Sequence, residues 1–223
     1  MKINSDTIAM LKNFANINTN IVFRPGNIIS TISNAKNIFA KASIEEELPN
    51  EFAIYDLNSL LAMLTLMENQ EVEFDDKKLN VSSSMGKFEY YYSNPELVTS
   101  APENEIHHVD VYTFKMTADD VQMLMKAASI TAAPTISITC KNQQVIVSVG
   151  DRKNETATNF SRQVGQSFEN FDVFIAVENL KVIPGAYDVT VAKTENGKAK
   201  FLHLVHESRP LKYWIACEPG SVV

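Results

Sequence analysis

One structural plan is written twice along this chain of 223 residues. Each half opens with a helical pattern that is apolar on one side, continues with strand-like runs, and has a second, shorter amphipathic helix before its last strands. The opening helices begin near Ser5 and Thr117, and the second helices begin near Asp56 and Val177. The duplication predicts an α+β fold of two similar domains, each with a core of its own.

Turn-forming and acidic residues separate the two halves. Ser93-Asn94-Pro95, Ser100-Ala101-Pro102 and Glu103-Asn104-Glu105 follow one another in an extended stretch. We predict an N-terminal domain over residues 1–92, an interdomain connector over 93–112 and a C-terminal domain over 113–223. Each half has roughly 110 residues, which is enough to bury a core.

The overall composition is that of a folded globular protein. Hydrophobic residues make up 45% of the chain and charged residues 21%, which argues against long disordered stretches. No apolar run approaches the roughly 20 residues that a membrane-spanning helix needs, and the first residues lack the apolar core of a signal peptide. We therefore expect an intracellular protein with no membrane partner.

The net charge of −7 argues against a simple basic domain that binds nucleic acid. The charge is uneven, however. Residues 1–112 carry 8 Lys and Arg against 16 Asp and Glu (−8), whereas residues 113–223 carry 12 against 11 (+1). An acidic protein still meets DNA productively where its few cations share one face.

Three of the four expected helices carry one lysine away from their apolar side. These lysines are Lys12, Lys126 and Lys181. Ser5 or Asp6, Asp56 and Thr117 are the expected N-caps, and Thr117 forms a capping box with Asp120. The positions predicted to face the core are Ile8, Leu11, Phe14 and Ala15; Leu57, Leu60, Leu61 and Leu64; Val121, Leu124, Met125 and Ala128; and Val177, Leu180 and Ile183.

The sequence offers no constellation of catalytic residues. Adjacent His107 and His108 lie in the connector and point different ways, and His203 and His206 are three apart on an expected strand, which places them on opposite faces. Seven glycines leave little room for a phosphate-binding loop. We therefore expect no catalytic site, no metal site and no cofactor.

Three short motifs resemble the sliding clamps of T-even-type bacteriophages. They are Leu11-Lys12-Asn13-Phe14-Ala15-Asn16-Ile17-Asn18, Phe52-Ala53-Ile54-Tyr55-Asp56-Leu57-Asn58 and Pro184-Gly185-Ala186-Tyr187. The resemblance implies a homotrimeric ring around duplex DNA, with helices lining the hole and antiparallel sheets outside. Such clamps tether the replicative DNA polymerase and are loaded by an ATP-dependent clamp loader. They also contact late-transcription factors in the cytoplasm of the infected bacterial host.

In such a ring the helix lysines become candidates for facing DNA. Lys12, Lys126 and Lys181 in three subunits would supply nine cations (3 × 3) around the duplex, and phosphate contacts of this kind carry no sequence information. Lys2, Lys115 and Arg24 are additional candidates. The competing interpretation of each is an ordinary solvated residue.

A partner peptide would dock near the connector and the last strand, as in clamps generally. The candidate residues are Tyr91 between Tyr90 and Tyr92, Leu97 and Val98 in the connector, and Tyr213, Trp214 and Ile215 in the last strand. A Trp beside a Tyr is a frequent interface anchor. The competing interpretation is that alternate residues of these strands belong to the core.

Two other classes of function remain open from the sequence. A structural or assembly protein of a virus, built of two α+β domains, is compatible with the acidic charge and the duplicated sheets. An enzyme with an unrecognised site is the less favoured of the two, because no constellation of residues supports it.

Overall fold

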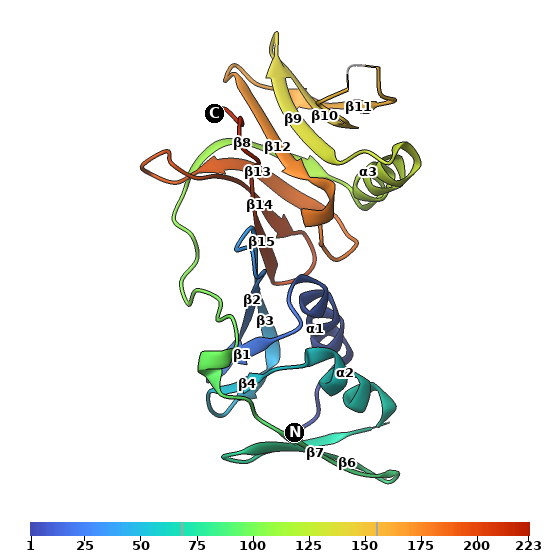
Figure 1. The fold of residues 1–223 in the computed structure, drawn as a ribbon, viewed down its shortest axis with the longest axis vertical. Coiled ribbons are helices and arrows are strands. Elements are labelled where there is room, and N and C mark those ends of the chain that lie inside the picture. The colour runs from blue at the N-terminus through green and yellow to red at the C-terminus, as the bar shows by residue number, and fades with distance from the viewer. Residues whose placement is uncertain (68, 155) are drawn as a thin grey trace. The chain divides into compact units, whose positions relative to one another are not determined.

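The computed structural model describes residues 1–67, 69–154 and 156–223. The chain divides into two units, Met1–Asn104 (unit 1) and Glu105–Val223 (unit 2), and Figure 1 shows the helices and strands of each. The division falls inside the segment predicted as the connector. Both units combine antiparallel sheets with α-helices, so the predicted α+β class is confirmed.

Unit 1 is built from two helices, seven strands and a 3-10 turn in its described residues. Strand β1 pairs with β4, β2 pairs with β3, and β5, β6 and β7 form a three-stranded sheet, all antiparallel. The elements are α1 (Ser5–Ile17), β1 (Ile21–Phe23), β2 (Gly26–Ile32), β3 (Ile38–Leu48), β4 (Phe52–Ile54), α2 (Leu57–Leu66), β5 (Glu71–Phe74), β6 (Lys78–Ser83), β7 (Gly86–Tyr91) and η1 (Pro95–Leu97).

Helix α1 is fixed at its start by a buried carboxylate. Its N-cap is Asn4, one residue before the predicted Ser5, and the Asn4 side chain accepts from the Thr7 N–H. Glu46 of β3 is only 8% exposed and accepts from the Asn4 N–H at 2.5 Å and from the Thr7 hydroxyl at 2.6 Å. A carboxylate at the positive end of a helix is electrostatically favourable, and it orients α1 against β3.

Unit 2 is built from two four-stranded antiparallel sheets and one helix in its described residues. One sheet has the order β11-β10-β9-β12 and the other β15-β14-β13-β8. The elements are β8 (Val109–Met116), α3 (Ala118–Thr131), β9 (Thr135–Lys141), β10 (Gln144–Gly150), β11 (Phe160–Gln166), β12 (Phe171–Ala176), η2 (Val177–Asn179), β13 (Tyr187–Lys193), β14 (Lys200–His206) and β15 (Leu211–Ala216).

The predicted faces of α1, α2 and α3 are confirmed, with small differences. Leu11, Phe14 and Ala15 of α1, all four predicted leucines of α2, and Val121, Leu124 and Ala128 of α3 are buried. Ile8 is half-buried, and Met125 is 36% exposed instead of belonging to the core. The predicted N-cap Asp56 and the Thr117–Asp120 capping box are both present.

The second helix predicted for the C-terminal half is wrong. Only the 3-10 turn η2 forms there, and the chain from Leu180 to Gly185 runs without helix. Two buried tyrosines bind the backbone at the expected end of the helix: Ile183 N–H donates to the Tyr213 hydroxyl, and the Tyr187 hydroxyl donates to Ile183 C=O. These tertiary bonds replace the helical pattern that Ile183 would otherwise make.

Candidate nucleic-acid and partner interfaces

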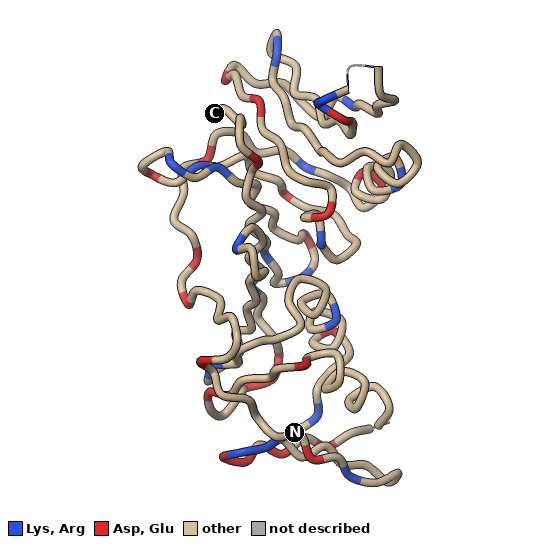
Figure 2. The backbone as a smooth tube through the Cα atoms, viewed as in Figure 1, with Lys and Arg blue, Asp and Glu red and all other residues tan. Residues whose placement is uncertain are grey.

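Each α-helix presents one face to solvent. Most side chains there are small or polar, but exposed acids and apolar residues lie among them: Asp6 on α1, Leu66 on α2, and Asp119, Met123 and Ile130 on α3. On α1 the exposed residues include Ser5, Lys12 and Asn16, and on α3 they include Gln122, Lys126 and Ser129. Helix α2 exposes Asn58, Ala62 and Thr65 and carries no lysine or arginine. Figure 2 shows basic positions on both α1 and α3. Each of these two helices therefore offers one lysine on its exposed face.

Neither Lys12 nor Lys126 forms an ion pair among the described residues. Both side chains are exposed and are therefore available to an external anion. Lys181 is also exposed, although it lies in the chain after η2 and not on a helix. These three lysines remain the proposed DNA-facing set.

The additional cations differ from the helix lysines in their surroundings. Lys115 of β8 lies 3.8 Å from Asp188 and 3.5 Å from Glu207, so two acids of its own unit compete for its charge. Lys2 is exposed near the start of the chain. A sliding contact with phosphate would have to displace the acids from Lys115 first.

Arg24 anchors the connector instead of facing outward. Its guanidinium donates to the Ser100 hydroxyl at 2.7 Å and to Ala101 C=O at 3.2 Å, and it pairs with Glu103 at 3.4 Å. Lys41 adds a bond to Glu103 C=O at 3.1 Å. We therefore remove Arg24 from the DNA-facing set, because its donors hold residues 100–103 against the rest of unit 1.

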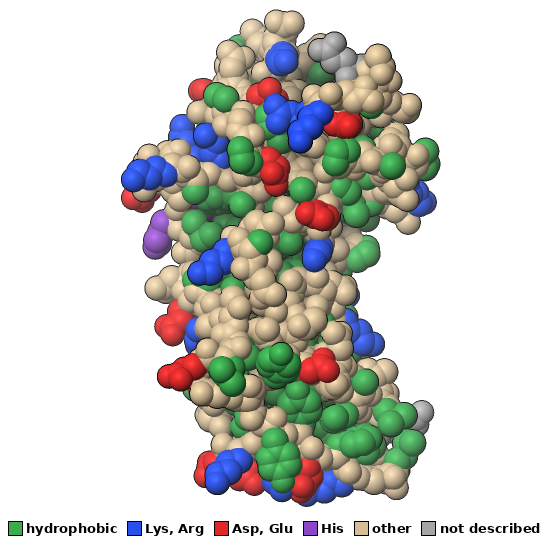
Figure 3. Space-filling view, in the orientation of Figure 1, with side chains coloured by type: hydrophobic (Ala, Val, Ile, Leu, Met, Phe, Trp, Pro, Cys, Tyr) green, Lys and Arg blue, Asp and Glu red, His purple; other side chains and the backbone are tan. Residues whose placement is uncertain are grey.

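The candidate partner residues fall into exposed and buried groups. Leu97 in η1 is 71% exposed and Tyr91 at the end of β7 is 65% exposed, with Lys78 Nζ 5.7 Å from the Tyr91 ring centroid. Val98 is buried against Val22 and Ala53 and so belongs to the core of unit 1. Figure 3 shows hydrophobic side chains gathered on one face of unit 1, over α2 and the sheet β5-β6-β7.

Tyr213, Trp214 and Ile215 are core residues, with 0%, 2% and 0% of their surface exposed. Consecutive buried residues on a strand mean that both faces of the sheet are covered. The Trp214 ring stacks on His203 at 4.8 Å, and His203 packs against His108 at 4.8 Å. Burial, with the charges of His108 and Lys212, lowers the pKa of His203 to about 4. These three side chains give a partner no accessible surface.

The sheets β5-β6-β7 and β11-β10-β9-β12 each have one covered edge and one open edge. Sequence reasoning missed this feature. In unit 1 the Met1 amino group donates to Val72 C=O and Val72 N–H donates to Met1 C=O, both at 2.7 Å, which covers β5. In unit 2 Asp172 and Val222 exchange backbone bonds of 2.9 and 2.8 Å, which covers β12. The open edges of these sheets are β7 and β11.

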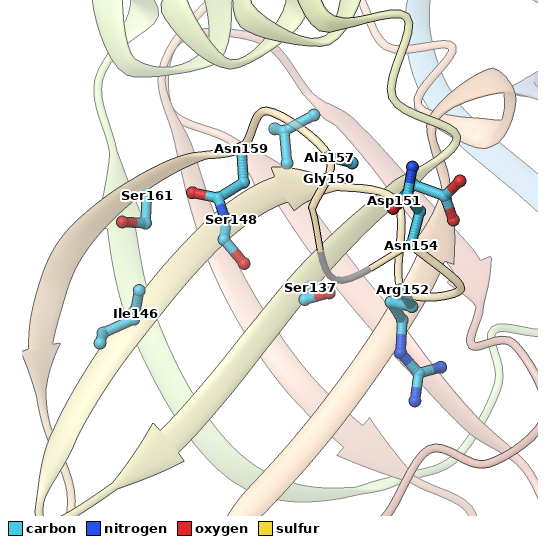
Figure 4. Close-up of a pocket in the computed structure, with 11 residues that line it drawn as sticks. Ser137, Ile146, Ser148, Gly150, Asp151, Arg152, Asn154, Ala157, Asn159 and Ser161 are labelled. Atoms are coloured by element: carbon cyan, nitrogen blue, oxygen red, sulfur yellow. The ribbon is translucent and has the colours of Figure 1, made fainter.

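A hollow of about 440 Å³ lies on the sheet β11-β10-β9-β12, where Ser161, Ser148 and Ser137 pair in register across three strands. In Figure 4 the Arg152 side chain points away from Ser148 and Ser161. The guanidinium lies over the Phe174 ring, 3.0 Å from its centroid. Small hydroxyl side chains explain the hollow, and its charged residues Asp151 and Arg152 belong to the adjoining loop.

The described residues contain no group of three His, Cys, Asp or Glu side chains placed to hold a metal ion. Among the same residues, no helix has the length and apolar character needed to cross a membrane.

Solved structures of PCNA proteins have the same fold as this chain. The PCNA2–PCNA3 complex from Sulfolobus tokodaii aligns with a TM-score of 0.67 at 11% identity, covering 97% of this chain and 98% of that chain. PCNA from Thermococcus kodakaraensis aligns with a TM-score of 0.65 at 12% identity, with the same coverage. The chain therefore has the PCNA-like clamp fold, as predicted.

Sequence relatives define the family within that fold. Residues 4–98 match the family described as DNA polymerase processivity factor, and residues 113–219 match gp45 sliding clamp, C terminal. The sliding clamp of Vibrio phage KVP40 is 32% identical over 98% of this chain and 99% of its own length. The sliding clamp of Enterobacteria phage T4 is 29% identical over 99% of this chain and 98% of its own length.

The chain belongs to the sliding clamps of T4-like phages, the non-enzymatic processivity factors of phage DNA polymerases. The predicted family is therefore confirmed. Family membership also sets aside the alternatives of a viral assembly protein and of an enzyme.

Proposed function

We propose that three copies of this chain form a closed ring around duplex DNA and tether the phage replicative polymerase to its template. The observation that carries this proposal is the pair of open edges on β7 and β11. A strand edge with unpaired N–H and C=O groups is a template for pairing with another chain. Two different edges on one chain give a head-to-tail contact, which closes into a ring when the rotation per subunit allows it.

The side chains of the two open strands support their pairing. Strand β7 has half-buried Phe88 and Tyr90 on one face, and its other face is exposed. Strand β11 has half-buried Phe160 and Val164. Pairing β7 of one copy with β11 of the next would bring these apolar residues together, and cross-strand apolar contacts stabilise antiparallel pairs.

The proposed DNA contacts are few and non-specific. Lys12, Lys126 and Lys181 would give nine cations in the ring, and the exposed neutral face of α2 would add none. A ring held on DNA by its topology does not need tight ion pairing, and a sparse lining leaves it free to slide.

Polymerase attachment would use the exposed apolar residues of unit 1. Leu97 is the proposed anchor, because η1 holds it outward beside the buried Val98. Tyr91 is the second proposed contact. We assign the clamp loader and late-transcription factors to the same surface, so they would compete with the polymerase in the cytoplasm of the infected bacterium.

The molecular mass in solution and the dependence on DNA ends test the ring together. We expect the mass of a trimer by sedimentation, and we expect loaded protein to stay on closed circular DNA but leave once the circle is cut. A protein that remains monomeric when concentrated, or that leaves circles and linear DNA equally fast, would refute the ring.

An edge variant tests the interface itself. Tyr92 N–H donates to the C=O of Lys77, the residue before β6, so by strand alternation the N–H of Glu89 points to the open edge of β7. Glu89→Pro removes that donor and should give monomers. Glu89→Ala is the matched control, since it also loses the 2.7 Å ion pair with Lys78 but keeps the N–H, and it should remain a trimer.

A further inference from the structure

Strand β12 combines a sheet edge with an aggregation-prone sequence. Its residues are Phe171-Asp172-Val173-Phe174-Ile175-Ala176, with one charge among six positions. Phe171, Val173, Phe174 and Ile175 are all at most 3% exposed. A short apolar run of strand-forming residues at an open edge pairs readily with an identical run of another chain.

The segment from Glu218 to Val223 closes that edge. Asp172 N–H donates to Val222 C=O at 2.9 Å, and Phe174 N–H donates to the Ser221 hydroxyl at 3.0 Å. Glu218 N–H donates to Phe174 C=O at 2.6 Å. Gly220 turns the segment with φ of +88°, and Ser221 is 6% exposed. The outward donors of Asp172 and Phe174 are thus both satisfied by six residues of chain.

Few hydrogen bonds join the segment Glu218–Val223 to β12. The contact consists of one isolated bridge, Asp172 with Val222, supplemented by the Ser221 hydroxyl and by the bond from Glu218 N–H to Phe174 C=O. The corresponding covered edge of unit 1 differs, because β5 has the sequence Glu71-Val72-Glu73-Phe74 and its two acids themselves oppose self-pairing. Only in β12 does the cover protect an apolar run.

We propose that the edge of β12 is a second, closed assembly surface for another copy of this chain, and that Glu218–Val223 keeps it closed. An antiparallel pair centred on Phe174 places Phe174 opposite Phe174 of the second copy and Asp172 opposite Ala176. No like charges then face each other, and the outward N–H groups of both strands find carbonyl partners. This contact is two-fold, so opening the cover would join two copies and, through them, two rings.

This proposal rests on the proposed function in one respect only: the particle whose mass doubles is the trimeric ring. The first variant ends the chain at Cys217. The second, Ser221→Ala with Val222→Pro, keeps the full length and removes both the serine acceptor and the Val222 N–H. Circular dichroism establishes that each variant is folded, and amide exchange at Phe174 reports whether the edge has opened.

Sedimentation velocity over a range of concentrations gives the result. We expect the parent protein to keep a single mass, and the variants to reach twice that mass at high concentration and to dissociate on dilution. A folded variant that keeps the parent's mass although Phe174 exchanges quickly overturns the proposal. If the parent protein is not a trimer, the proposed ring is refuted. In that case the doubling of the variants' mass relative to the parent still tests the β12 surface.

A Pro substitution locates the contact. The Asp172 N–H points away from β9, because it donates to Val222 C=O, so Asp172→Pro removes an edge donor without breaking the ladder with β9. In the chain ending at Cys217, Asp172→Pro should restore the parent's mass, whereas Asp172→Ala should not. Doubling that survives Asp172→Pro runs through another surface and overturns the proposal.

Discussion

Neutralising one helix lysine gives the sharpest test of the DNA-facing surface. Lys12→Gln changes an exposed side chain that has no ion pair among the described residues, so the fold loses no contact with the charge. In a trimer it removes three cations from the ring. If each meets a phosphate, the slope of log K against log salt falls by about 2.7, at about 0.9 for each contact. Raising the salt from 50 to 200 mM would then weaken DNA binding by the variant about 40-fold less than it weakens DNA binding by the parent protein.

Fluorescence anisotropy with a short blunt duplex measures this slope without a loader, because the proposed ring would thread onto free ends. Lys126→Gln should reproduce the effect in unit 2. Lys198→Gln, in the exposed hairpin turn between β13 and β14, is the matched control because it changes the net charge equally. If Lys12→Gln and Lys198→Gln shift the slope by the same amount, the loss reflects overall charge, and α1 does not face the duplex.

Four other substitutions and one control test the remaining contacts. Glu46→Ala should destabilise the protein by about 1–3 kcal/mol in urea, because it leaves two donors at the start of α1 without their acceptor, while exposed Glu47→Ala should change little. Trp214→Ala should cost about 3–5 kcal/mol as a core truncation and impair DNA retention and polymerase coupling together, whereas Leu97→Ser should impair only polymerase coupling. The pKa of His203 is lowered from 6.5 to about 4, so the unfolded chain takes up a proton first as pH falls. Stability should therefore decline from about pH 6.5 to pH 4, and His203→Phe should flatten that decline.

The helix faces were predictable because helical periodicity depends on each residue's own neighbours. Leu57, Leu60, Leu61 and Leu64 repeat at the spacing of one helical side, and all four are buried. The capping box at Thr117 was equally local. Strand β11 gave no such signal, because its sequence Phe160-Ser161-Arg162-Gln163-Val164-Gly165-Gln166 is mostly polar on both faces, as an edge strand permits.

Contacts from distant residues decided what the sequence could not. The periodicity of Val177, Leu180 and Ile183 is helical, yet Ile183 N–H donates to the hydroxyl of Tyr213, thirty residues away. The hydroxyl of Tyr187, four residues away, donates to Ile183 C=O. The candidate partner site also divided by burial: Leu97 stayed exposed, whereas Trp214 entered the core. Three consecutive apolar residues in a strand were the available sign that both faces are covered.

The two units leave non-equivalent strands open, and this asymmetry favours head-to-tail assembly. In unit 1 the open strand is β7, the last of its sheet along the chain, whereas in unit 2 it is β11, which a later strand follows. In each unit, a residue that follows the last strand forms an isolated β-bridge with an earlier strand. The pairs are Ser93 with Ala53 in unit 1 and Val222 with Asp172 in unit 2. Pairing β7 of one copy with β11 of the next is a head-to-tail contact that leaves one strand of each kind open until the assembly closes on itself. Because the segment Glu218–Val223 covers β12, two copies cannot pair through this same strand. The covered edge therefore favours the head-to-tail contact between β7 and β11.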